Sequence, residues 1–272
     1  MNPKKQLTYK IFVINMPDQK VRFQHISSQL KTFNLPFQKI DGVNISNLSN
    51  DELNKYYSLA KNRKLFPRKL TAGEIGCYIA HVKCWEEIIK QNIDFGIILE
   101  DDIRLDVKFL KALEFIDEHF DKWEFIRLQV ETKPRLLYQK EDFKDFSFYE
   151  FIRTSGCLWG YALKNKTTET LLKNILPFGM PADSNMHIYY KFNIDVKTLV
   201  PPVIFAGEGN FGSNIESFGK RSKLQNFYPF ARQVFSLKAY LGRCFQLTKR
   251  DGIFNALLSI FKSKKININI AY

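Results

Sequence analysis

Three consecutive carboxylates, Glu100, Asp101 and Asp102, follow the apolar run Phe95 to Leu99. Adjacent carboxylates repel one another and raise each other's proton affinity unless a cation lies among them. Oxygen ligands of this kind suit Mg²⁺ or Mn²⁺, which proteins often hold through one or two carboxylates and the phosphates of a substrate. The alternative is a solvated acidic turn without a ligand. The strongly apolar strand before the triplet favours the metal site, because a solvated turn does not require such a strand.

Successive residues of an extended strand point to opposite faces of a sheet. If Asp101 and Asp102 continue the strand, they cannot both be simple ligands of one ion. We therefore expect one of them to hold the metal and the other to contact a sugar or ribose.

The start of the chain predicts a β-α-β unit. Tyr9 to Met16 is a short apolar run closed by Pro17, and a helix is expected from Asp18, its cap, to Phe33. Phe37 to Asp41 predicts a second strand, which ends at the turn signal Asp41-Gly42. Such an opening favours a parallel sheet and an α/β fold.

The strongest helix signal stands directly before the acidic triplet. Thr71 and Glu74 form a T-x-x-E capping box, and apolar residues then recur on one helical face up to Ile89. This helix leads into the strand Phe95 to Leu99, and ligands in open α/β sheets collect at the carboxyl ends of strands. Further elements are expected as strands at Phe125 to Val130 and Cys157 to Leu163, a helix from Lys166 to Leu176, and a loop-rich region from Pro181 to Gly212.

The composition is that of a folded protein. The 272 residues are 45% hydrophobic, which suffices for one large α/β domain or for one domain with a small appendage. The four cysteines form no C-x-x-C pair and are expected to be reduced thiols in a reducing compartment. The apolar run Ile11 to Ile14 is too short for a signal peptide, and no run of about 18 apolar residues occurs. We therefore expect neither a standard export signal nor a membrane span.

The formal net charge of +13 is concentrated near the C-terminus. Residues 217–272 hold eleven Lys or Arg and one acidic residue, whereas residues 1–216 hold thirty basic and twenty-seven acidic ones. Apolar residues recur in the tail at near-helical intervals: Phe227, Phe230, Val234, Phe235, Leu237, Leu241, Phe245, Phe254, Leu257, Leu258 and Phe261. We predict an α/β domain at 1–216 and a basic amphipathic helical tail at 217–272, which either lies on an anionic membrane surface or packs on the domain.

Several motifs together resemble glycosyltransferase family 25, the lipopolysaccharide biosynthesis glycosyltransferases. The resemblance covers roughly residues 9 to 215, and the capped helix followed by the acidic triplet is its most specific part. The motifs are Leu70 to His81 with Trp85, Ile97 to Ile103, Val13-Ile14-Asn15 with Arg22, the Asp41-Gly42 turn, Gly160 to Leu163, and Pro181-Ala182-Asp183.

The resemblance implies a GT-A-like fold, with a Rossmann-like, mostly parallel sheet flanked by helices. It implies transfer of a hexose, most often galactose, from a UDP-sugar to a lipooligosaccharide acceptor, with inversion at the anomeric carbon and dependence on Mn²⁺ or Mg²⁺. Such an enzyme is expected in the cytoplasm, peripheral on the cytoplasmic face of the bacterial inner membrane. No nucleic-acid partner is expected.

The resemblance also assigns site residues. Asp102 is the expected metal ligand, and Asp101 is a donor contact and second candidate ligand. The other expected donor contacts are Asn15, Arg22, Asp41, Glu74, His81 and Glu100. Two positions depart from the family pattern: Ala80, where members often have Ser, and Ala182, where they often have Val.

Inverting transfer also needs a base for the acceptor hydroxyl. Asp183 is the candidate, and its structural alternative is the N-cap of a short helix that begins at Ser184. Glu74 is explained equally by its capping box, and His81 by burial in the core. His187 is a candidate second metal ligand. Four aromatic residues border the expected site and could stack on a sugar, although core packing is the simpler explanation of each: Trp159, Tyr161, Phe205 and Phe211.

Two other functions are open at this point. A metal-dependent phosphohydrolase also uses acidic strand ends, but it needs further His or Asp ligands, and the four His residues are scattered. An RNA- or membrane-binding module would be built around the tail, but the near-neutral body argues against this as the main function.

Overall fold

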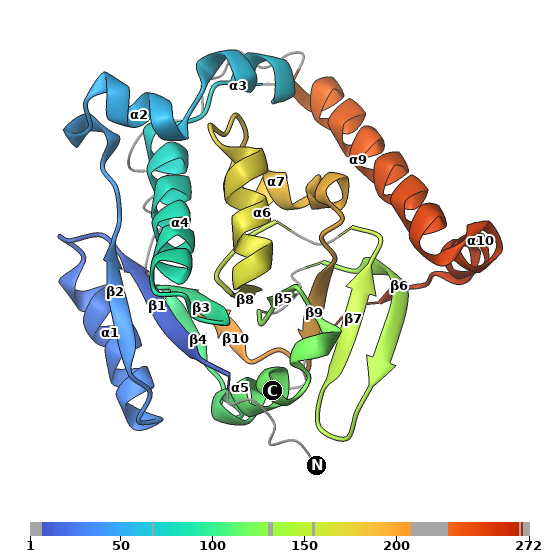
Figure 1. Ribbon diagram of the computed structural model, residues 1–272, viewed down its shortest axis with the longest axis horizontal. Coiled ribbons are helices and arrows are strands. Elements are labelled where there is room, and N and C mark those ends of the chain that lie inside the picture. The colour runs from blue at the N-terminus through green and yellow to red at the C-terminus, as the bar shows by residue number, and fades with distance from the viewer. Residues whose placement is uncertain are drawn as a thin grey trace.

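The predicted β-α-β unit opens the chain (Figure 1). The computed structural model describes residues 7–66, 68–129, 133–153, 156–207, 228–266 and 268. In it, β1 (Tyr9–Asn15) is followed by α1 (Lys20–Thr32) and β2 (Phe37–Asp41). β1 pairs in parallel with β2 on one side and with β3 (Phe95–Glu100) on the other, so the carboxyl ends of the three strands meet at one edge.

The predicted cap of the first helix, Asp18, is one residue too early. The N–H of Gln19 donates to the carbonyl oxygen of Met16 at 2.9 Å, which closes a turn directly after β1. Asp18 lies in this turn, and Gln19 occupies the N-cap position without a side-chain cap bond.

The helix before β3, α4 (Ala72–Lys90), begins at the predicted capping box. The Thr71 hydroxyl accepts the N–H of Glu74 at 3.2 Å, and the Glu74 carboxylate accepts the N–H of Thr71 at 2.9 Å. Gly76 allows the first turn of α4 to approach the loop after β2, because a Cβ there would lie 2.0 Å from the carbonyl oxygen of Val43.

Nine strands form one sheet in the order β11-β6-β7-β9-β5-β8-β3-β1-β2. The strands not yet given are β5 (Phe125–Arg127), β6 (Arg135–Asp142), β7 (Ser147–Phe151), β8 (Gly160–Lys164), β9 (Val196–Val200) and β11 (Lys265–Ile266). The pairings give β1, β2, β3, β5, β6 and β9 one direction and β7, β8 and β11 the opposite one. The predicted α/β class, with a mostly parallel sheet flanked by helices, is confirmed.

Helices pack on both faces of the sheet. The side chains of β1 alternate between two cores: Phe12 packs with α4 and α6 (Asn165–Ile175), and Ile11 and Val13 pack with α1 and α5 (Phe109–Glu118). The remaining described helices are α2 (Asn50–Tyr56), α3 (Leu59–Leu65), α7 (Ala182–Met186), α9 (Tyr228–Asp251), α10 (Ile253–Lys262) and the 3₁₀ turns Ile45–Asn47, Phe120–Lys122 and Tyr189–Phe192.

The loop-rich prediction for Pro181 to Gly212 is wrong in part. β9 lies inside the sheet between β5 and β7, and β10 (Ile204–Ala206) pairs antiparallel with β4 (Ile103–Leu105) directly after the acidic triplet. Both strands are short, and β9 contains Lys197 and Thr198, so neither has the long apolar run that marks β1 or β3. Residues 208–212 of the predicted region lie outside the described residues.

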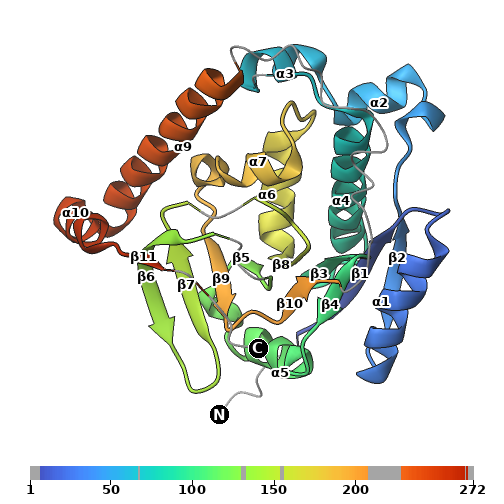
Figure 2. The ribbon, with the colours of Figure 1, turned by 180° about the vertical axis from the view of Figure 1, so that it is seen from behind.

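The tail forms the predicted helices α9 and α10 (Figure 2). α9 runs along one side of the molecule from α3, where Phe235 meets Phe66 edge-on, toward β6. Seven residues of the predicted apolar stripe are exposed: Leu237, Leu241, Phe245, Phe254, Leu257, Leu258 and Phe261. No helix within the described ranges is both long enough and apolar enough to cross a bilayer. The predicted boundary at 216/217 lies outside the described residues.

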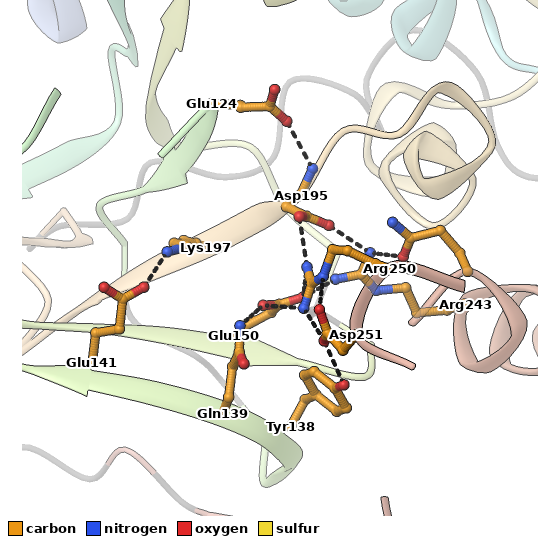
Figure 3. A network of polar contacts seen from close by, with 11 residues as sticks. Glu124, Tyr138, Gln139, Glu141, Glu150, Asp195, Lys197, Arg243, Arg250 and Asp251 are labelled. Carbon is orange, nitrogen blue, oxygen red and sulfur yellow. Dashed lines mark hydrogen bonds and ion pairs between the residues drawn. The ribbon is translucent and has the colours of Figure 1, made fainter. Parts of the chain in front are cut away.

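A polar network joins α9 to the sheet (Figure 3). Arg243 and Arg250 of α9 both form ion pairs with Glu150 of β7, which is 1% exposed, and with Asp195 before β9. Leu247 and Ala256 pack beside this network against Tyr138 and Ile152. The inward side of α9 therefore carries ion-paired arginines beside Leu247, whereas Leu237, Leu241 and Phe245 of the same helix are exposed.

Candidate active site

A cleft of about 470 Å³ opens at the carboxyl ends of β1 and β3. Eight of the predicted site residues line it: Asn15, Arg22, Glu74, His81, Glu100, Asp101, Asp102 and Asp183. They come from β1, α1, α4, the end of β3 and α7. The cleft therefore lies at the edge of the sheet where the parallel-strand argument places a ligand.

Asp101 is held by two donors from the N-terminal unit. Asn15 donates from Nδ2 to its Oδ2 at 2.6 Å, and Arg22 Nη1 lies 3.3 Å from its Oδ1. Parallel pairing of β1 with β3 sets Ile14 beside Glu100, which brings the next residues of both strands together. Burial raises the pKa of Asp101, and the contacts with Asn15 and Arg22 partly offset this rise. Both carboxylate oxygens are engaged within the protein.

Asp102 faces the same guanidinium. Arg22 Nη1 lies 3.3 Å from Asp102 Oδ2 as well as 3.3 Å from Asp101 Oδ1. The expectation that strand alternation separates the two carboxylates is wrong, because Asp101 and Asp102 form a turn between β3 and β4. The N–H of Gly207 donates to the Asp102 carbonyl oxygen at 2.8 Å and fixes this turn from β10.

The acidic cluster carries more negative charge than Arg22 neutralises. Burial, and then the charge of Glu100, raise the pKa of Asp102 to about 6. An added cation would relieve this repulsion, and the ligand atoms are hard oxygens. The donor set therefore fits Mn²⁺ or Mg²⁺.

Behind the cluster, His81 connects Glu100 to the core. His81 Nε2 lies 3.4 Å from Glu100 Oε1, and His81 Nδ1 lies 3.1 Å from Tyr161 Oη, which also accepts Trp85 Nε1–H at 2.9 Å. His81 is 0% exposed, as the core alternative predicts, yet its ring borders the cleft. Cys77 lies one helical turn before it, and one ligand atom each of Cys77, His81 and Glu100 lie within 4.8 Å of one another.

Glu74 is both a capping residue of α4 and a residue of the cleft lining. Its carboxylate caps α4 and pairs with Arg68, while its residue also lines the cleft. Because Thr71 and Arg68 already bind this carboxylate, capping explains it without a ligand.

Asp183 of α7 lines the cleft, and α7 packs against α4, where Asn185 donates to the Tyr78 hydroxyl at 2.7 Å. The N-cap alternative is wrong, because α7 begins at Ala182 with Pro181 at the cap position, and Asp183 lies inside the first turn. The Ser184 hydroxyl donates to Asp183 Oδ1 at 3.3 Å. Asp183 Oδ2 lies close to the backbone of Gly156, where an added Cβ would lie 2.8 Å from it.

The chain matches a known protein family over most of the region that forms the cleft. The family model of glycosyltransferase family 25 (LPS biosynthesis protein) matches residues 8–186, which is more than half of the chain. The chain belongs to glycosyltransferase family 25.

Relatives in family 25 include bacterial and animal proteins. The chain is 28% identical over 177 residues to a putative glycosyltransferase of Haemophilus influenzae, covering 64% of this chain and 61% of that protein. It is 26% identical over 202 residues to procollagen galactosyltransferase 2 of Mus musculus, covering 66% and 30%. It is 27% identical over 124 residues to the lipooligosaccharide biosynthesis protein lic2B of Haemophilus influenzae, covering 44% and 45%. The matched region thus spans less than two thirds of each relative's length.

Two predicted residues lie outside the cleft of this family 25 chain. Asp41 is exposed at the end of β2 and pairs with Lys39 at 2.8 Å. His187 follows α7 and is not among the residues that line the cleft. Burial, and then the charges of nearby arginines, lower the pKa of His187 to about 3, so its neighbours oppose a metal ion.

The four aromatic residues that were candidates for stacking on a sugar lie in different places. Trp159 lines the cleft, Tyr161 is buried behind His81, and Phe205 is buried against Arg104. Phe211 lies outside the described residues.

Sequence reasoning missed Cys77 and Cys157, which both line the cleft. The spacing of Cys77 and His81, four residues apart on a predicted helix, could have indicated one common face. Cys157 has a left-handed backbone, with φ of 72°, for which the sequence gives no signal at a cysteine.

Proposed function

We propose that this chain transfers galactose from a UDP-sugar to a lipooligosaccharide acceptor, with inversion and with a divalent metal ion. Family membership and the names of the relatives support the reaction class. The observation that carries the proposal is the convergence of Arg22, the acidic triplet and Asp183 on one cleft at the carboxyl ends of β1 and β3. This arrangement fits a GT-A-like donor site.

We assign donor binding to the wall built by β1, α1 and β3. Arg22 and Asn15 hold Asp101, whose contacts suit a role in positioning the nucleotide. Asp102, with its raised pKa, is the proposed ligand of Mn²⁺ or Mg²⁺. The ion, when bound, supplies positive charge that stabilises the departing diphosphate.

Asp183 is the proposed general base. It lines the cleft within a short helix that fixes its backbone, and it is partly exposed. Inversion requires the acceptor hydroxyl to attack from the side opposite the leaving diphosphate, and a carboxylate that lines the cleft can take its proton.

The test is a donor screen that measures UDP release from each UDP-hexose and UDP-N-acetylhexosamine, with and without Mn²⁺, in the presence of a lipooligosaccharide acceptor. The proposal requires acceptor-dependent UDP release that is greatest with UDP-galactose and needs the metal ion. Release of inorganic phosphate without an acceptor would instead support a phosphohydrolase. Among the four histidines, His81 alone lines the cleft, so no second histidine is placed there to serve as a ligand for that alternative.

We also propose that the protein lies on the anionic cytoplasmic surface of the inner membrane through α9 and α10. The exposed apolar stripe and the basic charge of the tail support this placement. The enzyme and an acceptor embedded in that leaflet would then share one surface.

A further inference from the structure

Three buried side chains form a line of polar contacts that ends at Glu100. Trp85 and His81 lie one turn apart on α4, and Tyr161 of β8 reaches between them. Trp85, Tyr161 and His81 are each 0% exposed. Because these groups are buried, each of their polar atoms is expected to have a hydrogen-bond partner.

The direction of each hydrogen bond follows from the chemistry of the donors. An indole N–H only donates, so Tyr161 Oη accepts from Trp85. Burial raises the pKa of Tyr161 well above its ordinary value, so the phenol keeps its proton. The acceptor that lies within hydrogen-bonding distance of this hydroxyl is His81 Nδ1, at 3.1 Å. A ring nitrogen that accepts carries no proton, so the proton of the neutral imidazole is on Nε2.

Nε2 faces Glu100. It is buried, it has no hydrogen bond of ordinary geometry, and it lies 3.4 Å from Glu100 Oε1. Contacts of this kind are often long before a ligand binds and shorten in the complex. We infer that His81 is a positioning residue, held as the Nε2–H tautomer by Tyr161 and Trp85, which orients the Glu100 carboxylate in the cleft.

The alternative is a thiol-containing metal site made by Cys77, His81 and Glu100. A metal ion on Nε2 would require the proton on Nδ1, donated to Tyr161 Oη. That oxygen would then accept from both His81 and Trp85, and the Tyr161 hydroxyl proton would lose its acceptor. A buried donor without a partner is unfavourable, so the network favours the proton on Nε2 over a metal ion.

The contact with His81 determines which oxygen of Glu100 is available to bind a ligand. With Oε1 held by His81, the other oxygen of this cleft-lining carboxylate is the one left to bind a ligand. The catalytic part of this inference rests on the proposed function, whereas the tautomer itself does not.

The first experiment measures the tautomer directly by long-range ¹H–¹⁵N correlation spectra of the full-length chain labelled with ¹⁵N-histidine. The four histidines are assigned by single replacement. We expect the His81 ring to show the Nε2–H pattern, unchanged by Zn²⁺, and to lose this single tautomer in Tyr161→Phe. An Nδ1–H pattern in the unchanged protein, or metal-bound nitrogen shifts on addition of Zn²⁺, would overturn the inference.

The second experiment measures the affinity for UDP with Mn²⁺ by calorimetry. His81→Leu removes the donor and should weaken this affinity by about 10-fold to 100-fold, the usual effect of losing a residue that orients a ligating group. His81→Gln offers an N–H at similar reach and should recover most of the loss, and Cys77→Ser should have little effect.

Tyr57→Phe is the matched control for Tyr161→Phe, because it removes a buried hydroxyl that contacts Asn62 at 3.2 Å outside the cleft. Thermal unfolding of each variant checks that it is folded. Equal affinity in His81→Leu and the unchanged protein would overturn the positioning role. If the unchanged protein binds no UDP, the proposed function fails, and the tautomer spectrum alone decides this inference.

Discussion

Asn15, the last residue of β1, donates from Nδ2 to Oδ2 of Asp101, the first residue after β3, across 2.6 Å. The same Nδ2 donates to the Gln19 carbonyl oxygen at 3.0 Å, which ties the turn before α1 to the acidic cluster. Arg22 lies in the first turn of α1. Asn15 therefore positions both the Asp101 carboxylate and the start of the helix whose Arg22 guanidinium contacts it.

We expect Asn15→Ala to destabilise the protein by about 1.5–3 kcal/mol, the range for a lost hydrogen bond to a charged group. Urea unfolding measures this change. Asn174→Ala is the control, since that exposed amide donates to a carbonyl oxygen within α6. Equal stability changes in the two variants would show that the contact with Asp101 contributes nothing particular.

Asp102→Asn should abolish metal-dependent binding of UDP and leave the fold intact. Its charge is repelled by Glu100 and is partly buried, so its removal should not lower the free energy of unfolding. Calorimetry of UDP with Mn²⁺ measures the binding, and the exposed Asp18→Asn is the control. Metal-dependent affinity that survives in Asp102→Asn would contradict the assignment.

Asp183→Asn should retain the affinity for UDP and lose transfer by about 10²-fold to 10⁴-fold, as expected for removal of a general base. Ser184→Ala removes the hydroxyl that donates to Asp183 and should have a much smaller effect. The measurement is the turnover number at saturating donor and acceptor. Normal turnover in Asp183→Asn would place the base elsewhere.

His187 should make the protein less stable in acid. Its pKa is about 3 in the fold and about 6.5 in the unfolded chain, so the unfolded state binds the proton first. The stabilisation by neutral His187 is complete above pH 6.5 and is lost by up to about 1.4 kcal/mol per pH unit as the pH falls toward 3. His187→Gln should reduce this slope in urea unfolding between pH 6 and 4, with His119→Gln as the control for loss of one histidine. An unchanged slope in His187→Gln would contradict the prediction.

Phe254→Ser with Phe261→Ser should weaken binding to anionic vesicles without changing the fold. These side chains are 90% and 86% exposed, and burial of one phenylalanine contributes about 1.5–3 kcal/mol, so a loss of at least about tenfold is expected. Vesicle sedimentation at low and high salt measures the binding. Val107→Ser, at a site 84% exposed near α5, is the control. Equal sedimentation of all three proteins would refute the membrane proposal.

Local patterns predicted the elements that carry the site. The apolar runs of β1 and β3 and the capping box at Thr71 mark their structures in the sequence itself, and they place the acidic triplet at the sheet edge. β9 could not be found in this way, because its position between β5 and β7 depends on pairing across distant parts of the chain.

The polar contacts within the site could not be predicted from the sequence either. The contact of one Arg22 nitrogen with two carboxylates depends on the turn after β3. The contact of Tyr161 with His81 depends on how β8 packs against α4. Spacing along the chain indicates neither contact, since each joins residues about 80 positions apart.

The polar network of α9 determines where the chain can be cut. Glu150 is 1% exposed, and its ion-pair partners in the described structure, Arg243 and Arg250, both belong to α9. A protein shortened before α9 would lack both arginines that pair with this carboxylate, and breaking a buried ion pair typically costs about 3–5 kcal/mol. A form that does not bind membranes is therefore better obtained by replacing the exposed phenylalanines of α9 and α10 than by removing these two helices.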